Sequence, residues 1–514
     1  MTQPQRKWLP FLDWFGIWPG AAAYEADGRA WVSEAPQGVQ LAVQMPTQSP
    51  PLLVVDRPWE SALGYATAFY DEGRYRLWYG AQTSAEGYPN GMLCYAESAD
   101  GFQWEKPVVG QLDWNGSRAN NIVFNKSIEG CVFRDPSADA GERYKLIFME
   151  PGADYQGQRI YGAELNRVTK QLQAQGINPA DLYGKHLRLV GAVYGAVSPD
   201  GLQWHQIAEP LFEKFCDTQN VVYYDTAKGN YVGYWRTGNG NRRAIARSET
   251  ADFRHWPLPE IVLQPDGQDA PTDDYYTNGY SPYPGNSNFH LMFSSIYRRV
   301  RDFCDVQLAV SRNGVNWSWP ERRPILSPIG PRDKGGLYPG PGLLPLTDNR
   351  WGLLCRYEAV MHNEGYYYSP PAERAGSVGW AIWPRDRLVA LEAPLEGQVT
   401  LNKQRCSGEP LLLNYQTEAN GWIQVELIEP TLWPPAPLAP IPGYAFADCT
   451  PVQGDNSAAA VHWQGSADLS ALHGREICMR IRLCRAKLFA LSLEPLAESE
   501  SVGMYWKIVG PENF

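Results

Sequence analysis

Residues 58–79 read Pro58-Trp-Glu-Ser-Ala-Leu-Gly-Tyr-Ala-Thr-Ala-Phe-Tyr-Asp-Glu-Gly-Arg-Tyr-Arg-Leu-Trp-Tyr79. Apolar and aromatic side chains alternate over residues 65–70 and again over residues 75–79. Between the two runs stands Asp71-Glu72-Gly73, a turn sequence in which Gly readily adopts the positive φ of a tight turn. The stretch therefore predicts a β-hairpin, with Glu60 just before its first strand.

Similar hairpin patterns recur along the chain. They fall at residues 129–148, 217–236, 273–293 and 333–355. A repeated four-stranded unit cannot bury both of its faces alone, so such a series favours a ring of packed sheets. Together with the first copy, the hairpins predict a five-bladed β-propeller.

A second repeated pattern, Ser-x-Asp-Gly-x-x-Trp, alternates with the hairpins. It occurs at residues 98–104 and 198–204, with looser copies at residues 248–256 and 311–317. The Asp or Asn side chain closes a turn, Gly supplies a positive φ, and Trp packs on the outer strand. We interpret this pattern as a structural turn between the third and fourth strands of a blade, and we assign its Asp residues no catalytic role.

The patterns predict an all-β chain of three parts. Residues 1–50 are expected to form an N-terminal strap packed on the propeller, residues 51–385 the catalytic propeller, and residues 386–514 a β-sandwich. Within the second blade, residues 151–190 form an insertion in which residues 165–175 have helical character. The blades are expected at residues 51–110, 118–208, 209–262, 263–325 and 326–385.

Composition excludes several classes of protein. The 514-residue chain has a net charge of −11, which argues against a nucleic-acid partner. It contains no run of about 20 apolar residues, so we expect no membrane span. Nine cysteines without Cys-x-x-Cys pairs fit a reducing compartment, and the N-terminus shows no secretory pattern, so we expect a cytoplasmic protein. No metal or phosphate-binding motif is present, and we expect no cofactor and no metal.

The hairpins, the Ser-x-Asp-Gly-x-x-Trp turns and the sequence Arg134-Asp135-Pro136 together resemble the five-bladed propeller glycoside hydrolases of families 32, 43, 62 and 68. The C-terminal domain also resembles the architecture of family 32. The sequence Trp-Met-Asn-Asp-Pro-Asn-Gly of that family is absent, which points to a distant member. The resemblance implies a glycosidase acting on a short oligosaccharide or a chain end, with furanosides among the candidate substrates.

Propeller geometry selects the acidic residues. Side chains at the start of a blade's first strand, or just after its second, converge on the central funnel. In the resembled families the two catalytic carboxyl groups lie on blades one and three, and Glu60 and Asp217 occupy those positions here. Their residue types are exchanged relative to the family pattern, so the role of each is left open. Asp274 and Glu358 are the next candidates.

Asp135 is a secondary catalytic candidate, because the resemblance to family 32 favours it. The hairpin alignment favours another interpretation, since Asp135, Asp71 and Asp225 all stand at the turn after a first strand, away from the funnel. Further residues at funnel positions are predicted to bind substrate through charge, hydrogen bonds or stacking: Trp59, Glu129, Arg236, Tyr276, Tyr297, Tyr338, Arg356, His362 and Tyr366.

Two rival functions remain open. A non-hydrolytic sugar-active enzyme, a lyase or a glycosyltransferase, would use the same propeller, and a lyase would favour Tyr297, His362 and arginines over a carboxylate pair. A propeller that only binds carbohydrate would spread its funnel acids apart. Each reading has a small carbohydrate as its partner, and assembly into a homo-oligomer is left open.

Overall fold

The computed structural model describes residues 8–24, 27–28, 30–83, 91–126, 129–178, 181–363, 365, 368–430 and 439–492. The chain divides into two compact units. The larger contains Pro46–Trp317 and Arg322–Ile382, and the smaller contains Met1–Met45, Ser318–Glu321 and Trp383–Phe514. In the part of the chain that is described, no helix is long and apolar enough to cross a membrane.

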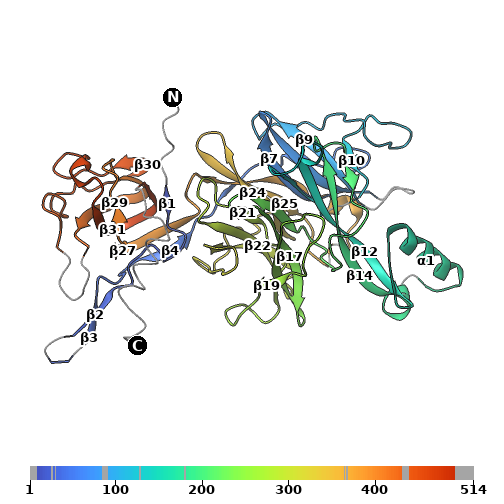
Figure 1. The fold of residues 1–514 in the computed structure, drawn as a ribbon, viewed down its shortest axis with the longest axis horizontal. Coiled ribbons are helices and arrows are strands. Elements are labelled where there is room, and N and C mark those ends of the chain that lie inside the picture. Colours follow the sequence, from blue (N-terminus) through green and yellow to red (C-terminus); the bar gives the residue numbers. More distant parts are fainter. Residues whose placement is uncertain are drawn as a thin grey trace. The chain divides into compact units, whose positions relative to one another are not determined.

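The larger unit begins with three antiparallel sheets, each made from consecutive strands (Figure 1). The first contains β7 (Ala62–Asp71), β8 (Arg74–Gln82), β9 (Gly91–Ser98) and β10 (Ile122–Phe124). The second contains β11 (Cys131–Arg134), β12 (Tyr144–Tyr155), β14 (Arg188–Ser198) and β15 (His205–Gln206), with β13 (Gln158–Tyr161) paired to β12. The third contains β16 (Val221–Asp225), β17 (Asn230–Asn239), β18 (Arg242–Thr250) and β19 (Glu260–Leu263).

A larger sheet contains two further antiparallel groups, which a parallel pairing of Cys304 with Gly336 joins. One group is β20 (Asp273–Tyr275), β21 (Tyr280–Pro282), β22 (His290–Arg298) and β23 (Phe303–Ser311). The other is β24 (Gly336–Leu346), β25 (Arg350–Glu358) and β26 (Ser377–Pro384), with β5 (Thr47–Gln48) and β6 (Leu53–Val54) paired to β26. Strands from before the first sheet thus complete the last group.

The all-β prediction and the repeated up-and-down sheets are confirmed. The first strands of the groups contact one another, since β7 lies against both β11 and β24, and β11 lies against β16. We interpret each group as one propeller blade, and the number of five blades stays a prediction. One boundary differs from the prediction, because the first sheet extends to β10 and therefore beyond residue 110.

The hairpin at Asp71 forms as predicted. Strands β7 and β8 pair from Ala62–Gln82 down to Asp71–Arg74 at the turn. Glu72 and Gly73 both have positive φ, 51° and 83°, as a two-residue turn between twisted strands requires. This local geometry explains why the turn sequence alone located the hairpin.

The Ser-x-Asp-Gly turns are structural, and they also connect neighbouring blades. Asp100 Oδ1 accepts hydrogen bonds from the backbone N–H groups of Phe102 (2.7 Å) and Gln103 (2.8 Å). The carbonyl of Gly101 accepts a hydrogen bond from Trp380 of the last blade at 2.7 Å. In the same way, Trp78 of the first blade donates to the carbonyl of the second blade's turn glycine at 2.7 Å.

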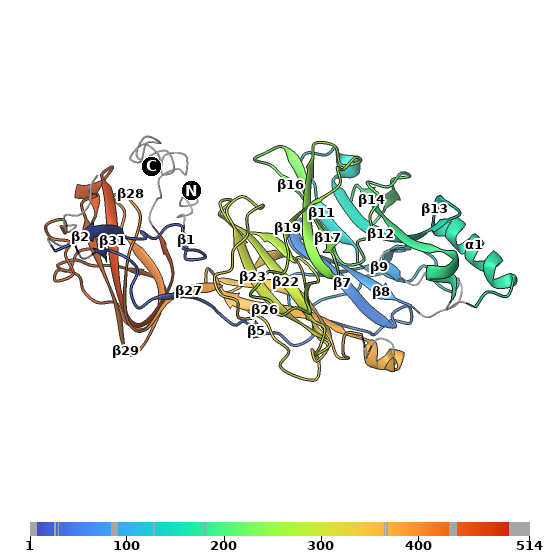
Figure 2. The same ribbon diagram turned by 90° about the horizontal axis from the view of Figure 1, so that it is seen from below.

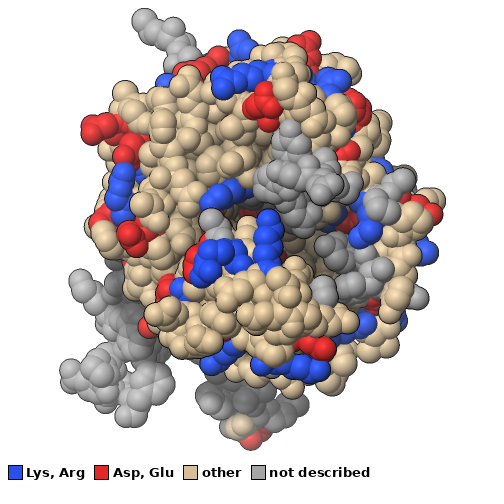
Figure 3. All heavy atoms as spheres, turned by 90° about the vertical axis from the view of Figure 1, so that its right-hand side faces the viewer, with Lys and Arg blue, Asp and Glu red and all other residues tan. Residues whose placement is uncertain are grey.

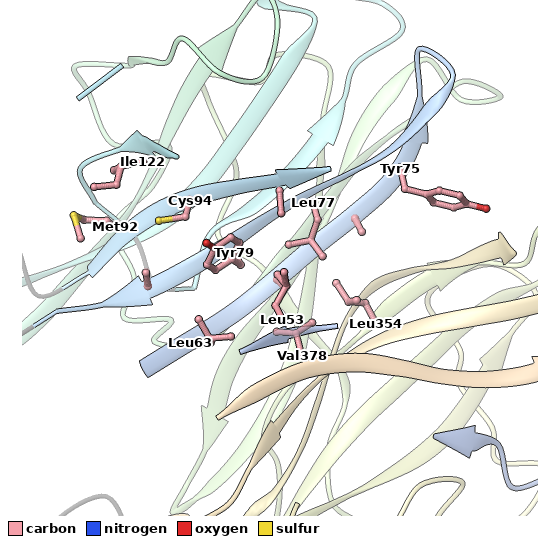
Figure 4. Packing of buried hydrophobic residues seen from close by; sticks show 14 of the residues in the cluster. Leu53, Leu63, Tyr75, Leu77, Tyr79, Met92, Cys94, Ile122, Leu354 and Val378 are labelled. Carbon is pink, nitrogen blue, oxygen red and sulfur yellow. The ribbon is translucent and has the colours of Figure 1, made fainter. Parts of the chain in front are cut away.

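Buried side chains join the first and last blades (Figure 4). Leu63 and Tyr79 of the first blade pack with Leu354 and Val378 of the last, and each is at most 1% exposed. Leu53, which comes from the N-terminal strand β6, lies in the same cluster. The closure of the ring therefore rests on hydrophobic burial as well as on strand pairing.

The insertion in the second blade contains the predicted helix. Helix α1 (Gly162–Ala174) follows β13, and a π-helical turn, η2 (Leu182–His186), precedes β14. Leu165, Val168 and Leu172 of the helix pack with Ala153 and Leu187 in a small core of their own. Short 3-10 turns elsewhere are η1 (Ala140–Glu142), η3 (Pro371–Arg374) and η4 (Ser470–Leu472).

The smaller unit is built around one sheet with two long adjacent strands, β29 and β31 (Figure 2). Its strands run in the order β30 (Asp455–Ala460), β29 (Leu412–Ile428), β31 (Glu476–Ser492), β27 (Val389–Thr400) and β4 (Gln40–Val43), and β1 (Leu9–Pro10) and β28 (Gln404–Arg405) pair with β31. Strands β2 (Ala21–Tyr24) and β3 (Ala30–Ser33) form a separate hairpin. The β-sandwich stays a prediction.

The N-terminal segment differs from the predicted strap. Strand β1 pairs with β31, and β4 pairs with β27, so residues 9–10 and 40–43 extend the sheet of the smaller unit. Leu41, Ala42 and Val43 are at most 5% exposed. This apolar run pairs along an edge of the sheet. The aromatic composition of the segment did not indicate that pairing.

Candidate functional site

Five aromatic side chains from different blades meet where the first strands of the larger unit begin. We call Tyr65, Tyr276, Tyr297, Tyr338 and His362 the tyrosine cluster. Ring centroids of Tyr276 lie 6.1 Å from those of both Tyr297 and Tyr338, and Tyr65 lies 5.9 Å from Tyr338. Four of the five were predicted to lie at funnel positions or to bind substrate, and the structure brings them together.

His362 occupies the middle of this cluster. Its ring centroid lies 4.4 Å from that of Tyr297 and 4.7 Å from that of Tyr276, and its Nδ1 lies 2.5 Å from the Tyr338 hydroxyl. Burial, together with nearby arginines, lowers the pKa of His362 to about 4. The negative charge of Asp302 opposes this shift. The imidazole is therefore neutral at pH 7.

The phenols of the cluster stay protonated. Burial raises the pKa of Tyr276 to about 12 and raises the pKa values of Tyr65, Tyr297 and Tyr338 well above their usual range. Tyr297 also donates a hydrogen bond to Asp302 at 2.8 Å, which raises its pKa further. These side chains are suited to donating hydrogen bonds rather than to accepting a proton from a substrate.

Arginines lie over the tyrosine rings. The guanidinium carbon of Arg236 is 4.9 Å from the ring centroid of Tyr276, and that of Arg243 is 5.2 Å away from it. Arg356 lies 5.3 Å from the ring centroid of Tyr338 and donates to the carbonyl of Leu63 at 2.7 Å. These cation–π contacts place positive charge against the rings of the cluster.

A cleft of about 620 Å³ opens beside the cluster. Among the described residues, four arginines and no Asp or Glu line it, and we call it the arginine cleft. Its lining comes from the segment before β16, from the ends of β17, β18 and β22, and from the segment after β25. The lining residues are Phe215, Arg236, Thr237, Gly238, Gly240, Asn241, Arg242, Arg243, Tyr297, Arg299 and Asn363.

Two carboxyl groups flank the tyrosine cluster, each paired with one of its arginines. Asp217 pairs with Arg236, and its side chain is 38% exposed. Glu358 pairs with Arg356 and is 9% exposed. Burial raises the pKa of Glu358, although Arg356 opposes the effect. The two acids therefore occupy different electrostatic environments.

Asp274 binds two of the arginines that line the cleft. Its side chain has no exposed surface, and it accepts hydrogen bonds from Arg243 Nη1 at 2.6 Å and from Arg299 Nε at 2.7 Å. Burial alone would raise its pKa, but the bonds from Arg299 and Arg243 hold the pKa below its usual range. Asp274 thus holds two arginines in place and is itself shielded from a ligand.

Glu60 lies apart from this group. Its side chain has no exposed surface and accepts hydrogen bonds from the Tyr79 hydroxyl at 2.6 Å and from Lys106 Nζ at 2.8 Å. The neighbouring Trp59 donates to Asn121 at 3.0 Å within the core of the first blade. The structure therefore does not pair Glu60 with Asp217, because the partners of Glu60 all belong to the first blade.

Asp135 is buried at the turn after β11, as the hairpin alignment indicated. It accepts hydrogen bonds from the Tyr231 hydroxyl at 2.6 Å and pairs with Lys145 at 3.1 Å. Burial would raise its pKa, but the bonds from Tyr231 and its other partners hold the pKa low. Glu129 is partly exposed before β11, and Tyr366 lies outside the described residues.

Gln219 shows that the first strands converge. Its amide nitrogen donates to the Thr67 hydroxyl at 3.2 Å and to the carbonyl of Gly130 at 3.0 Å, which links the first three blades. The side chain is 2% exposed. Its position between Asp217 and Val221 explains why Asp217 lies near the centre of the larger unit.

Sequence reasoning missed several residues of the site. Arg243 stands at the start of β18, directly across the turn from the end of β17, so the rule for second-strand exits extends to it. Asp302 has a positive φ of 55° and accepts hydrogen bonds from Tyr297 and from the backbone N–H of Asn363. No local pattern marked Asp302, and its partner Asn363 is 61 residues away in sequence.

Among the described residues, no group of three or more His, Cys, Asp or Glu side chains forms a candidate metal site. No family model matches the chain. One curated relative, the uncharacterized protein MT1551 of Mycobacterium tuberculosis, is 33% identical over 117 residues, which cover 22% of this chain and 34% of that protein.

Solved structures with a similar fold include glycoside hydrolases. One, described as a glycoside hydrolase, has a TM-score of 0.42 and 12% identity over 67% of this chain and 94% of its own. The GH32 β-fructofuranosidase BmSUC1 of Bombyx mori has a TM-score of 0.39 and 9% identity, covering 87% and 94% of the two chains. The GH62 α-L-arabinofuranosidase catalytic domain of Coprinopsis cinerea has a TM-score of 0.36 and 12% identity, covering 66% and 96%. Families 32 and 62 are among those that the sequence resembles.

Proposed function

We propose that this chain is a glycosidase that cleaves a short oligosaccharide or a chain end, with furanosides among its candidate substrates. The observation that carries the proposal is that two carboxyl groups, Glu358 and Asp217, each pair with an arginine that lies over a ring of the tyrosine cluster. Glycoside hydrolysis needs one protonated and one ionised carboxyl group, and unequal environments provide that difference.

In this proposal Glu358 is the general acid. Burial favours its protonated form, and it donates its proton to the glycosidic oxygen as the bond to the sugar carbon breaks. Asp217 serves as the carboxylate that attacks that carbon or removes a proton from the attacking water. Arg236 pairs with Asp217 and lines the arginine cleft, so it holds this carboxylate at the edge of the space that the sugar would enter.

The protonation states of the tyrosine cluster favour hydrolysis over elimination. A lyase needs a base that removes a proton from carbon, and the candidates for that base are Tyr297 and His362. The raised pKa of Tyr297 and the low pKa of His362 both oppose that role. A lyase, a glycosyltransferase and a module that only binds carbohydrate remain the alternatives that the experiment separates.

The test is a hydrolysis screen against aryl glycosides, including furanosides, and natural oligosaccharides. Glu358→Gln and Asp217→Asn should each lower kcat by about a hundredfold or more, the usual contribution of general acid–base catalysis. Asp225→Asn is the matched control, because Asp225 ends the strand β16 that Asp217 precedes and accepts hydrogen bonds within its own turn. It should keep wild-type kcat.

Other outcomes would replace the proposal. An unsaturated product would identify a lyase, and transfer of the sugar without release would identify a glycosyltransferase. A sugar that raises the melting temperature without any turnover would favour a binding module. Cleavage that both variants retain would reject this pair of acids.

A cytoplasmic location is also part of this proposal. All nine cysteines lie within the described residues as free thiols, seven of them buried. This state is the one that a reducing compartment maintains. The measurement is the thiol count of the protein isolated from its native cells, and disulfides in that sample would argue for an oxidising compartment.

A further inference from the structure

The arginine cleft has an unusual charge for this chain. The whole protein carries a net charge of −11, yet the residues described in the lining of the cleft include four arginines and no acidic side chain. In the view of Figure 3, Lys and Arg side chains likewise gather around a hollow near the middle of the face. A neutral sugar needs hydrogen-bonding groups but no such concentration of positive charge.

Carboxylates lie close to these arginines, but none of them is among the described residues that line the cleft. Asp274 is a single carboxylate shared between Arg243 and Arg299, and Asp217 pairs with Arg236. Asp273 pairs with Arg298, which also pairs with Asp305. Asp266, whose charge interacts with Arg242, pairs with Arg322.

Arg242 and Arg299 keep donors available for a ligand. Arg242 directs Nε to the carbonyl of Asp273 at 2.9 Å and Nη2 to the carbonyls of Ala270 and Asp273. Arg299 directs Nε and Nη2 to Asp274 and to the carbonyl of Asn241. Within the described part of the chain, Nη1 of each arginine has no acceptor, while the rest of each guanidinium is held in place.

We propose that the substrate carries an anionic group, a carboxylate, phosphate or sulfate, which binds to Arg242 and Arg299 in the arginine cleft. Held guanidinium groups bind such oxyanions through short, charge-assisted hydrogen bonds. The exposed amide of Asn363, which also lines the cleft, supplies a neutral donor nearby. That the anion belongs to a sugar rests on the proposed glycosidase function.

The test measures binding rather than turnover, using the full chain. The probes are glucuronate, glucose 6-phosphate and glucose 6-sulfate, with glucose as the neutral control, each titrated by calorimetry at two salt concentrations. At least one charged sugar should bind at least tenfold more tightly than glucose, and its affinity should fall with added salt. The sugar that binds best distinguishes carboxylate from phosphate or sulfate as the natural group.

Two variants locate the subsite. Arg242→Gln and Arg299→Gln should each weaken binding of the charged sugar about ten- to hundredfold, as expected for loss of a charge-assisted hydrogen bond. Arg254→Gln is the control, because Arg254 pairs with Glu142 away from the cleft, and it should bind like the wild type.

Some results would overturn the inference and others would overturn only the function. Equal binding of glucose and all charged probes, or wild-type affinity in both folded variants, would reject the anion subsite. Binding of a charged sugar that Arg242→Gln weakens, without hydrolysis of any glycoside, would keep the subsite and reject the glycosidase. If one variant does not fold, the other decides.

Discussion

Glu60 and Glu358 are both buried glutamates, and each pairs with one basic side chain. They differ in the hydrogen bonds that they receive, and this difference distinguishes a structural residue of the propeller from a residue of the candidate site. Glu60 receives hydrogen bonds from Tyr79, from Lys106 and from the backbone amides of Asp56 and Arg57. Glu358 has Arg356 as its ion-pair partner and a raised pKa. Glu60 is thus held by four hydrogen-bond donors, whereas burial favours the protonated form of Glu358, which can then donate a proton.

The comparison also shows why position in a blade is insufficient. Both glutamates occupy positions that the propeller geometry assigns to the funnel. Lys106, the ion-pair partner of Glu60, comes from the segment after the first blade's Ser-x-Asp-Gly turn, 46 residues away. The role of each acid therefore depends on the donors that the fold brings to it.

The largest effect on stability is expected when the ion pair of Glu60 is broken. Lys106→Met should lower the free energy of unfolding by about 3–5 kcal/mol, because it leaves a fully buried carboxylate without its cation. Urea unfolding measures the change. Lys228→Met, at a lysine whose side chain is 46% exposed, should change stability by less than about 0.5 kcal/mol. A stability loss as small as that of the control would place Glu60 outside the structural frame.

The second prediction concerns the pH dependence of activity. Because the pKa of Glu358 is raised, wild-type activity should persist above the usual glutamate range and fall as pH rises through the pKa of Glu358. Glu358→Gln should lower kcat by about a hundredfold and remove this alkaline limb. Glu60→Gln should lower stability but keep the limb, as pH–rate profiles of folded enzyme would show. A limb that Glu60→Gln abolishes would reverse the two assignments.

The third prediction concerns Asp274, whose pKa in the folded state is lowered. The stability that it contributes is present above the unfolded-state pKa of about 4 and is lost as pH falls through its lower folded-state value. Asp274→Asn should therefore flatten the fall in stability below pH 4, as thermal melts at several pH values would show. Asp348→Asn, in an exposed turn, should leave that slope unchanged.

The smallest effect is expected at the hydroxyl of Tyr297. Tyr297→Phe removes the donor to Asp302 but leaves the backbone hydrogen bond from Asn363, so stability should fall by about 1 kcal/mol. Chemical denaturation measures this change. Tyr70→Phe, at a tyrosine that is 56% exposed, is the matched control and should show no loss. A loss above about 3 kcal/mol would show that Tyr297 supports the cluster more than the hydrogen bonds of its hydroxyl with Asp302 and Asn363 indicate.

Much of the fold was predictable because its signals are local. The Glu72-Gly73 turn, the Ser-x-Asp-Gly turns and the helix in the insertion each depend on neighbouring residues. The pairing of the N-terminal segment with β31 and β27 was not predictable, because it joins residues that lie hundreds of positions apart. The candidate site divides in the same way, since the predicted His362 and Tyr338 meet, whereas Asp302 carried no local signal.

By itself, the sequence determined that this chain forms repeated β-hairpins, where their turns lie, and which residues stand at the ends of the strands. These features follow from backbone preferences and from alternation of apolar side chains, both of which act over a few residues. Only the tertiary structure decided that Glu60 is held by Lys106, that Asp274 serves two arginines, and that four arginines line one cleft. The charge state of an acid depends on donors within a few ångströms, and folding chooses those donors from distant parts of the chain.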